Sequence, residues 1–276
     1  MPLPNKLTEL FKKYDITPSK RFGQNFLIDD NIVHKIVRQI RTSDKTDIIE
    51  VGPGLGQLTR IILGSIPHNQ VHVIEYDKKC LAYLYDLEKQ YQNKLHVIAQ
   101  DALKFDERSL LTESDQKLTL ISNLPYNISV LLLLKWLKSI DLFDSMVLMF
   151  QREVAERIIA KPHSKAYGVV SILTQYLCDV EICFHVPPTA FFPAPKIESS
   201  VVLFKPKKDA IERMKMFETL RLICNTAFSQ RRKMAKNTLL TLIPNISEIL
   251  RELSIPETTR PEDLSVTDFE NICALY

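Results

Sequence analysis

The stretch DIIEVGPGLGQLT, residues 47–59, decides the fold that this sequence predicts. β-Branched residues dominate its first five positions, which is typical of a buried strand. Gly52, Gly54 and Gly56 follow in alternate positions, and the next residues begin a helical pattern. In open parallel sheets a ligand binds outside the carboxyl ends of the strands, where glycines let the backbone approach it closely. We therefore expect a strand, a glycine turn and a helix that together border a binding site.

The same pattern recurs along the next hundred residues. Each further apolar run is followed by a segment with helical character, and this alternation predicts βαβ units. The expected fold is α/β and Rossmann-like, with a parallel sheet that helices cover on both faces. Further strands are expected at residues 71–75, 95–101, 117–123 and 145–151.

The C-terminal third of the sequence has a different composition and pattern. Residues 185–196 are rich in proline and predict an irregular, stiffened loop, and SSVVLFKP (199–206) predicts a last strand. The remaining sequence is helical with short breaks. We expect a large domain over residues 1–206 and a small helical domain over residues 207–276.

Charge is distributed unevenly along the chain. Lysine and arginine outnumber aspartate and glutamate by 8 to 4 in residues 1–41 and by 11 to 4 in residues 186–240. The middle segment has 15 basic against 18 acidic residues, and the tail has 2 against 7. Such blocks are often only solvated faces, but two basic blocks in one chain favour a polyanionic partner.

Several classes of site and location are disfavoured by the composition. The five cysteines are scattered and lack the paired spacing of a zinc site, so we expect reduced thiols and no metal. The apolar runs are too short and too interrupted to cross a membrane, and no secretory pattern begins the chain. A cytoplasmic protein without a membrane partner is the expectation.

Acidic residues end the second and third predicted strands. Glu75 lies 23 residues after Gly52, where an acid accepts hydrogen bonds from ribose hydroxyls in dinucleotide-binding folds. Asp101 follows the next strand, and its carboxylate suits the amino group of an adenine ring. Either acid alone is more often a solvated charge at a strand end. Together, after a glycine turn, they favour a cofactor that contains adenosine.

The glycine spacing helps to choose between two such cofactors, NAD and S-adenosylmethionine. The G-x-G-x-x-G pattern that seats a pyrophosphate on a helix N-terminus is absent, because position 57 is Gln57. A cofactor without phosphates, S-adenosylmethionine, fits better.

The stretch SNLPYNIS, residues 122–129, ends the fourth predicted strand. An adenine amine is a poor nucleophile, and two acceptors on its N–H groups would direct its lone pair at a methyl donor. The side-chain oxygen of Asn123 and the carbonyl of Leu124 can supply those acceptors. Pro125 would stiffen the turn, and Tyr126 offers a ring on which the base stacks. The alternative is an ordinary turn capped by the asparagine.

At this point the sequence resembles a known family, the small-subunit ribosomal RNA adenine-N6,N6-dimethyltransferases, also known as kasugamycin-sensitivity dimethyladenosine transferases. The resemblance covers nearly the whole chain, and its most specific segments are SNLPYNIS and FSQRRKMAKNTL. The stretches that carry it, in the family's order, are KRFGQNFLID (20–29), EVGPGLGQLT (50–59), VIEYD (73–77), QDAL (100–103), SNLPYNIS (122–129), QREVAERI (151–158), SKAYGVVS (164–171), FFPAPKIESSVV (191–202) and FSQRRKMAKNTL (228–239).

The resemblance implies roles for individual residues. Phe191 matches the aromatic residue that sandwiches the target adenine against Tyr126, although Phe192 beside it is a second candidate. The implied catalytic residues are Asn123, Leu124, Pro125, Tyr126 and Phe191. The implied cofactor-binding residues are Asn25, Leu27, Gly52, Glu75, Asp101 and Asn123.

Basic side chains lie beside several of these motifs. A cluster in QRRKMAK is as often an exposed helix face as a binding site. Basic groups that border a base pocket nevertheless fit the path of an RNA backbone, which they would position without reading its sequence. The expected RNA-binding residues are Lys20, Arg21, Lys196, Arg231, Arg232, Lys233 and Lys236.

The resemblance also implies the reaction and the partner. The expected enzyme is a monomer that dimethylates two adjacent adenines in a hairpin near the 3′ end of small-subunit rRNA. Its substrate would be a precursor small ribosomal subunit, and it would take part in small-subunit biogenesis. Three alternatives remain open: a large-subunit rRNA adenine methyltransferase of the antibiotic-resistance type, a mainly non-catalytic ribosome-assembly factor and, more distantly, a DNA adenine methyltransferase.

Overall fold

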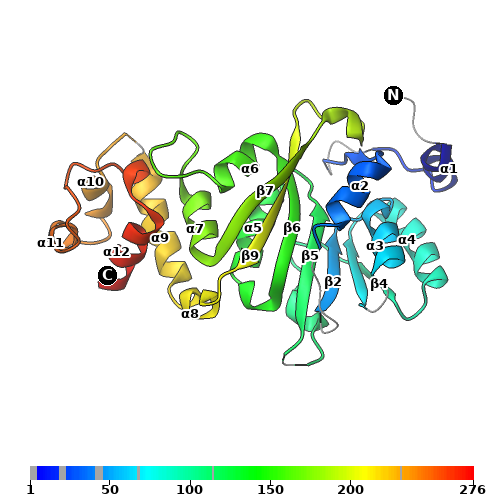
Figure 1. Cartoon of the computed structure of the whole chain (residues 1–276), viewed down its shortest axis with the longest axis horizontal. Coiled ribbons are helices and arrows are strands. Elements are labelled where there is room, and N and C mark those ends of the chain that lie inside the picture. Colours follow the sequence, from blue (N-terminus) through cyan, green and yellow to red (C-terminus); the bar gives the residue numbers. More distant parts are fainter. Residues whose placement is uncertain (1–4, 19–22, 41–45, 67–68, 114, 231) are drawn as a thin grey trace. The chain divides into compact units, whose positions relative to one another are not determined.

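The structure is a computed structural model that describes residues 5–18, 23–40, 46–66, 69–113, 115–230 and 232–276 (Figure 1). It divides into two compact units, which are described separately. The first unit comprises Met1–Lys135, Leu142–Arg152 and Glu181–Lys205, and the second comprises Trp136–Asp141, Glu153–Val180 and Pro206–Tyr276.

A seven-stranded sheet has the order β4-β3-β2-β5-β6-β9-β7 (Figure 1). The first five strands in that order are mutually parallel, and β9 runs antiparallel to β6. The expected parallel sheet is therefore confirmed. Its strands are β2 (Thr46–Val51), β3 (Val71–Glu75), β4 (Leu95–Ala99), β5 (Lys117–Asn123), β6 (Phe143–Gln151), β7 (Cys178–Val186) and β9 (Ser199–Pro206).

The strand order reverses between β2 and β5. From β2 the chain continues outward to β3 and β4, and it then returns to β5 on the other side of β2. At such a reversal the connections leave in opposite directions and open a crevice outside the carboxyl ends of the strands. The central strands are fixed by burial on both faces, since Ile48, Ile49, Leu120 and Ile121 are all fully buried. The glycine turn and Asn123 thus end neighbouring strands.

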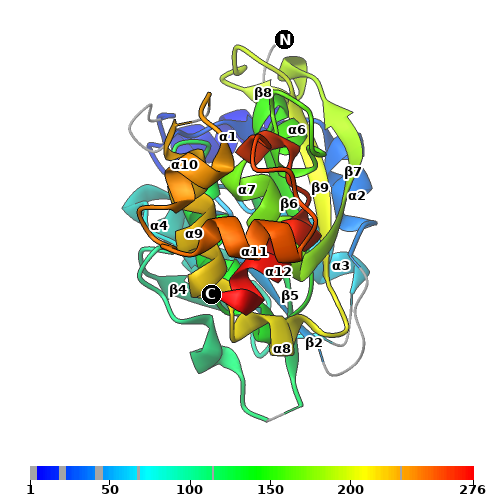
Figure 2. The ribbon, with the colours of Figure 1, turned by 90° about the vertical axis from the view of Figure 1, so that its left-hand side faces the viewer.

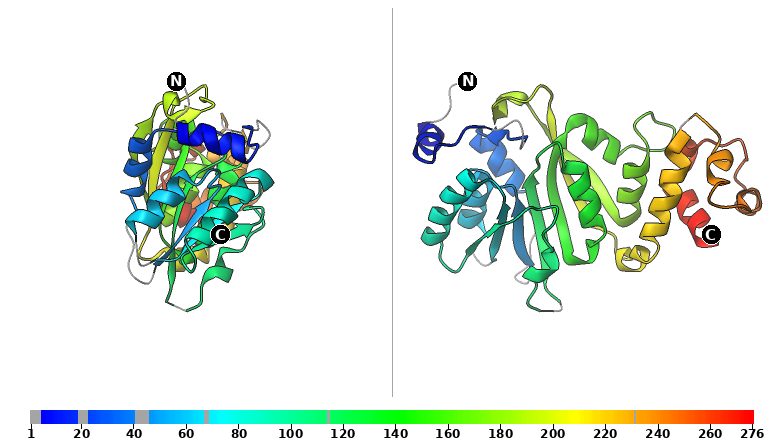
Figure 3. Two further views of the ribbon diagram at one scale, coloured as in Figure 1. Left: turned by 90° about the vertical axis from the view of Figure 1, so that its right-hand side faces the viewer. Right: turned by 180° about the vertical axis from the view of Figure 1, so that it is seen from behind.

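Helices cover both faces of this sheet (Figure 3). α2 lies on the face seen in Figure 1, whereas α5 lies on the face seen from behind in Figure 3. The helices of this part of the chain are α1 (Asn5–Lys13), α2 (Asp30–Val37), α3 (Gln57–Ser65), α4 (Lys78–Gln90) and α5 (Ser129–Leu137), with short 3-10 turns at η2 (Glu107–Leu110), η3 (Ile140–Leu142) and η4 (Pro188–Ala190).

A second, two-stranded sheet joins segments far apart in the sequence. β1 (Phe26–Leu27) pairs antiparallel with β8 (Phe191–Phe192), with Phe26 opposite Phe192 and Leu27 opposite Phe191. The ring of Phe11 packs edge-on against Phe26 and Phe192. This pairing fixes the segment that precedes α2, and no periodicity in the sequence indicates it.

The second unit is largely helical, and its C-terminal helices are seen together in Figure 2. The unit includes α7 as well as the residues from 206 onward, because α7 packs against α8, α9 and α12. It therefore differs from the single division expected between residues 206 and 207. Its elements are α6 (Arg152–Ile158), α7 (Val169–Leu177), α8 (Ala210–Met214), α9 (Phe217–Ala227), η5 (Phe228–Gln230), α10 (Ala235–Leu239), α11 (Ile246–Glu252), η6 (Pro261–Asp263) and α12 (Val266–Leu275).

Among the described residues, no helix has the length and apolar character needed to cross a membrane.

Candidate active site

A cavity of about 290 Å³ lies outside the carboxyl ends of β2, β3, β4 and β5. Its walls come from the glycine turn, the three strand ends beside it and the segment that contains β1. The structure brings together nine residues that the sequence predicts for the site: Asn25, Leu27, Gly52, Glu75, Asp101, Asn123, Leu124, Pro125 and Tyr126.

The glycine turn leaves room for a ligand. Gly52 and Gly54 have φ angles of +67° and +55°, which side chains with a Cβ rarely adopt. A Cβ on Gly54 would lie 2.9 Å from the ring of Phe26, so a side chain here would be strained and would force that ring to move. A Cβ on Gly52 would have Pro125 at 3.7 Å as its only near neighbour among the described residues, and would otherwise fill space in the cavity. The turn is therefore a cradle for a bound group.

Glu75 connects this turn to the end of β3. One carboxylate oxygen accepts hydrogen bonds from the backbone N–H groups of Tyr76 and Asp77, each at 2.8 Å. The other accepts from the N–H of Gly54 at 3.1 Å. Burial raises the pKa of Glu75 above its usual range, although these hydrogen bonds act in the opposite direction. The second oxygen retains a lone pair for a ligand hydroxyl, because a carboxylate can accept about four hydrogen bonds.

Asp101 shapes the loop after β4. Its Oδ1 accepts a hydrogen bond of 3.0 Å from the N–H of Leu103, and its backbone carbonyl accepts from the N–H groups of Lys104 and Phe105. Asp101 is partly exposed and lines the cavity together with Ala102 and Leu103. The loop thus presents a carboxylate at the position expected to recognise an adenine amino group.

Asn123 is oriented by the segment that contains β1. Its Nδ2 donates a hydrogen bond of 3.0 Å to the backbone carbonyl of Asn25. This bond orients the amide group, whose oxygen is the side-chain atom that can accept a hydrogen bond from a ligand. Asn25 is itself held by a bond from its Nδ2 to the carbonyl of Gly23 at 3.2 Å.

Tyr126 is fixed at both its backbone and its hydroxyl group. Its phenol oxygen lies 2.6 Å from the Oγ of Ser199, a fully buried residue at the start of β9. Its carbonyl accepts from the Oγ of Ser129 at 3.0 Å. Burial raises the pKa of Tyr126, so the phenol is neutral at physiological pH. The ring therefore has a defined place at the cavity wall.

Glu50 is a buried acid beside the cavity. It is 2% exposed, and its Oε2 accepts a hydrogen bond of 2.6 Å from the Oγ1 of Thr59. Burial raises the pKa of Glu50 to about 8, so its carboxyl group is mainly protonated at pH 7 in the absence of a bound cation.

Phe191 occupies a different place from the other predicted catalytic residues. It is 2% exposed, belongs to the hydrophobic core and does not line the cavity. The adjacent ring of Phe192 is half-buried and lies 5.8 Å from the ring of Phe11. Neighbouring residues of a strand point to opposite faces, so only one of these two rings belongs to the core.

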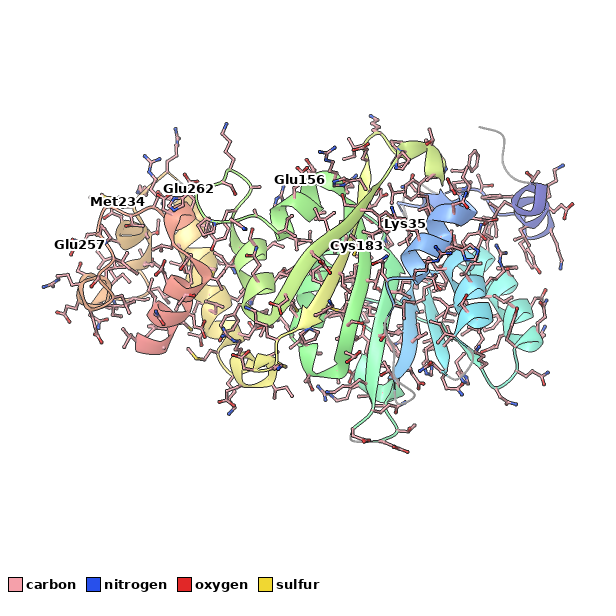
Figure 4. The ribbon with its side chains drawn as sticks, in the orientation of Figure 1. Lys35, Glu156, Cys183, Met234, Glu257 and Glu262 are labelled. Carbon is pink, nitrogen blue, oxygen red and sulfur yellow. The ribbon has the colours of Figure 1, made fainter. Side chains whose placement is uncertain are left out.

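Among the described residues, none of those predicted to bind RNA lines the cavity. Lys196 is exposed in the loop after β8, and Arg232 and Lys233 are exposed after η5. Lys236 is half-buried, and its Nζ lies 2.5 Å from a carboxylate oxygen of Glu257, which is labelled in Figure 4. Lys20, Arg21 and Arg231 lie outside the described residues.

Sequence reasoning missed several contributors to the cavity. Gln24 donates from its Nε2 to the Oδ2 of Asp77 at 2.7 Å, while the Oδ1 of Asp77 caps α4 through the N–H of Lys79. An aspartate directly before a helix is a signal for such a cap, and it stood in the VIEYD stretch. Ser199 gave no comparable signal, because its bond to Tyr126 depends on the pairing of β9 with β6.

A Rossmann-like sheet with a glycine turn, an acid at the end of β3, a second acid in the loop after β4 and no pyrophosphate fingerprint defines the class of S-adenosylmethionine-dependent methyltransferases. Within that class, residues 17–276 match the model of one family, described as "Ribosomal RNA adenine dimethylase". The chain belongs to this family of enzymes. S-Adenosylmethionine is accordingly its cofactor.

Two relatives support the assignment. The chain is 44% identical over 282 aligned residues to the "Ribosomal RNA small subunit methyltransferase A" of Bartonella tribocorum, covering 100% of this chain and 99% of that protein. Identity to the protein of the same name from Bartonella henselae is 43%, covering 98% and 96%.

Two solved structures agree with the fold. A dimethyladenosine transferase from Plasmodium falciparum has a TM-score of 0.74 and 25% identity, covering 90% of this chain and 95% of that chain. The 23S rRNA methyltransferase ErmE has a TM-score of 0.66 and 17% identity, covering 91% and 98%. The second likeness shows the fold alone.

Proposed function

We propose that this dimethylase acts on small-subunit rRNA within a precursor small ribosomal subunit. Its targets would be two adjacent adenines in a hairpin near the 3′ end, and the reaction would form part of small-subunit biogenesis. The relatives that share 40–44% of their residues with this chain carry the name of small-subunit methyltransferases, which supports the choice of subunit. We further propose a cytoplasmic monomer, a setting compatible with its five free cysteines.

The observation that carries the catalytic proposal is the hydrogen bond from Asn123 to the backbone of Asn25. It turns the amide so that its oxygen can accept from the N–H of an adenine amine. Leu124 also lines the cavity, and its backbone carbonyl would accept from the second N–H. Two acceptors would hold the amine so that its lone pair faces the methyl group to be transferred.

The cofactor supplies a methyl group on a positively charged sulfur. The chain's own residues would position the amine and stabilise the positive charge that develops on it, and no strong base is needed because a methylated amine loses its proton readily. Tyr126, held by Ser199, would supply the stacking surface for the base. The cavity must also accept the monomethylated product for a second transfer.

We propose that the cofactor occupies the cavity along the strand ends. Gly52 would adjoin its methionine end, Glu75 its ribose and Asp101 its adenine, while Asn25 and Leu27 would cover it. Their common position on one cavity supports these roles. Pro125 lies in contact range of the Gly52 position and would keep the catalytic turn against the cofactor.

We propose that the second ring that stacks on the target base is that of Phe191 or of Phe192. The burial of Phe191 in the core means that it would have to be uncovered by movement of β8, or that the half-buried Phe192 performs this role instead. A comparison of Phe191→Ala with Phe192→Ala separates the two. The ring that stacks should change the KM for RNA, whereas a purely structural ring should lower stability alone.

The RNA path is proposed to follow the basic residues that the sequence predicts. Lys196, Arg232, Lys233 and Lys236 would contact phosphates, together with Lys20, Arg21 and Arg231. Residues 207–276 would form the main RNA-binding part of the chain.

The experiment is transfer of labelled methyl groups from S-adenosylmethionine to small subunits that lack the modification. Wild type, Asn123→Ala and the exposed control Asn31→Ala should be compared, with digestion to identify the nucleoside product. We expect wild type and the control to produce dimethyladenosine. Asn123→Ala should lower the rate at least about a hundredfold, as removal of a positioned hydrogen-bonding group does in other enzymes.

Two other results would overturn parts of the proposal. Methyl transfer only to naked large-subunit RNA would identify the antibiotic-resistance type of enzyme. Tight binding to small subunits with no transfer to any RNA would identify an assembly factor without catalysis.

A further inference from the structure

The loop after β4 is fastened by a lysine from a distant helix. Lys135, in the last turn of α5, is directed at the backbone of this loop. Its Nζ donates to the carbonyl of Ala102 at 2.7 Å and to the carbonyl of Phe105 at 2.5 Å. The third acceptor is the Oε1 of Glu107, at 2.7 Å. An ammonium group has three hydrogens, so all of them are used on one loop.

This contact is sheltered from solvent. The Lys135 side chain is 23% exposed and that of Glu107 is 3% exposed. A buried carboxylate needs its charge partner, and loss of the ammonium would leave two carbonyls and a carboxylate without this donor. The lysine therefore determines the path of the chain between Asp101 and Glu107.

The fastened loop is part of the cavity. The backbone carbonyl of Ala102 accepts the hydrogen bond from Lys135, and Ala102 also lines the cavity. Asp101 and Leu103 line the same part of the cavity. The carboxylate of Asp101 is held by the N–H of Leu103, so its position follows the loop backbone. A change at residue 135 would thus be felt at the carboxylate expected to recognise adenine.

We propose that Lys135 is a positioning residue for the cofactor, which sets the loop 101–107 so that Asp101 and Ala102 meet the adenine end of S-adenosylmethionine. The inference rests on the proposed cofactor role of the cavity. Lys135 touches the loop and acts on the cofactor only through it.

The proposal predicts which substrate is affected. Tyr126 is held by Ser129 and Ser199, and neither bond involves the loop. Removal of the ammonium should therefore weaken the cofactor interaction and leave recognition of the RNA base intact. A general loss of folding would impair both.

The test compares Lys135→Met, which keeps the apolar stem, with Lys135→Arg and with Lys138→Met. Lys138 is half exposed and pairs with Glu218, so it is a matched control for loss of one positive charge. In Lys135→Met the Kd and KM for S-adenosylmethionine should rise about tenfold, while the KM for RNA stays unchanged. Lys135→Arg should retain most of the affinity for S-adenosylmethionine, and Lys138→Met should behave as wild type.

Hydrogen exchange of the full chain gives a second readout. Backbone amides of residues 103–107 should exchange faster in Lys135→Met than in wild type or Lys138→Met. An unchanged Kd in folded Lys135→Met, or an equal loss in Lys138→Met, overturns the proposal. If Lys135→Met does not fold, Lys135→Gln takes its place, and an unchanged Kd there has the same meaning.

Asp101→Asn separates this inference from the proposed cofactor site. If Asp101→Asn weakens cofactor binding but Lys135→Met does not, only the positioning role fails. If wild type binds the cofactor and neither variant weakens it, the proposed place of the adenine fails as well. Weakening in both variants supports both.

Discussion

The phenol oxygen of Tyr126 lies 2.6 Å from the Oγ of Ser199, a residue 73 positions later in the chain. One belongs to the turn after β5, and the other begins β9, two strands away across the sheet. The bond is sheltered, because Ser199 is fully buried. The ring on which a base can stack is thus held by β9, a strand from which no described residue lines the cavity.

Loss of this bond should slow the reaction without unfolding the chain. We expect Ser199→Ala and Tyr126→Phe each to lower kcat/KM for RNA by about fivefold, the effect of losing one hydrogen bond worth ~1 kcal/mol. The double variant should be no worse than either single one, because both remove the same interaction. The rates of all four proteins form the double-mutant cycle. Additive losses would show that the two residues act independently.

A side chain at position 54 of the glycine turn should destabilise the chain. Gly54→Ala places a methyl group 2.9 Å from Phe26 on a backbone with φ of +55°. We expect a loss of about 1–3 kcal/mol in unfolding free energy, measured by urea denaturation, together with weaker cofactor binding.

A matched control for this substitution exists in the helix that follows. Gly64 lies in α3, and a Cβ built on it meets no atom of the described part of the chain within 4 Å. Gly64→Ala should stabilise the chain by roughly 0.5–1 kcal/mol, because alanine favours a helix more than glycine does. Equal effects of the two substitutions would contradict the steric argument.

Glu50 should make stability depend on pH. Its pKa is raised from 4.5 to about 8 in the folded chain by burial. The stabilisation from its neutral carboxyl group is therefore fully present below pH 4.5 and is lost as the pH rises to about 8. Relative to Glu50→Gln, wild type should lose unfolding free energy across this range and show no further relative change above it.

Urea denaturation at several pH values, without cofactor, measures this difference. Glu248→Gln, which removes an exposed acid of α11, should follow wild type. Parallel pH profiles for wild type and Glu50→Gln would show that Glu50 is ionised in the folded chain.

The basic residues after η5 should contribute unequally to RNA binding. Lys233 is exposed, whereas the charge of Lys236 is already compensated by Glu257. Lys233→Gln should make the negative slope of log K against log salt about one unit less steep if it contacts a phosphate, and Lys236→Gln should change the slope less. Equilibrium binding to small subunits over a range of salt tests this. A larger change in Lys236→Gln would mean that RNA displaces Glu257.

Local sequence was sufficient for the sheet and for most of the site. The runs at 71–75 and 117–123 agree with β3 and β5 to the residue, because β-branched apolar residues bounded by turns leave few alternatives. The third run was expected to extend to residue 101, whereas β4 ends at Ala99. Asp101 instead starts the loop, where its side chain caps the backbone.

Some strands and helices could not be predicted from the local sequence pattern. β1 and β8 have two residues each, and they exist only because Phe26 and Leu27 meet Phe192 and Phe191. β7 and α7 were not expected either. Their residues are apolar in runs that fit a strand or a helix, and packing against other elements decides between the two.

The sequence by itself determined the class of fold, the glycine turn, the acids at two strand ends and the position of Asn123, since each follows from short-range pattern at the end of a strand. Only the tertiary structure decided that Asn123 donates to Asn25, that Ser199 holds Tyr126, that Lys135 fastens the loop after β4 and that Phe191 lies in the core. These hydrogen bonds join residues between 28 and 98 positions apart. Strand order and helix packing determine such contacts, and periodicity within a short window does not record them.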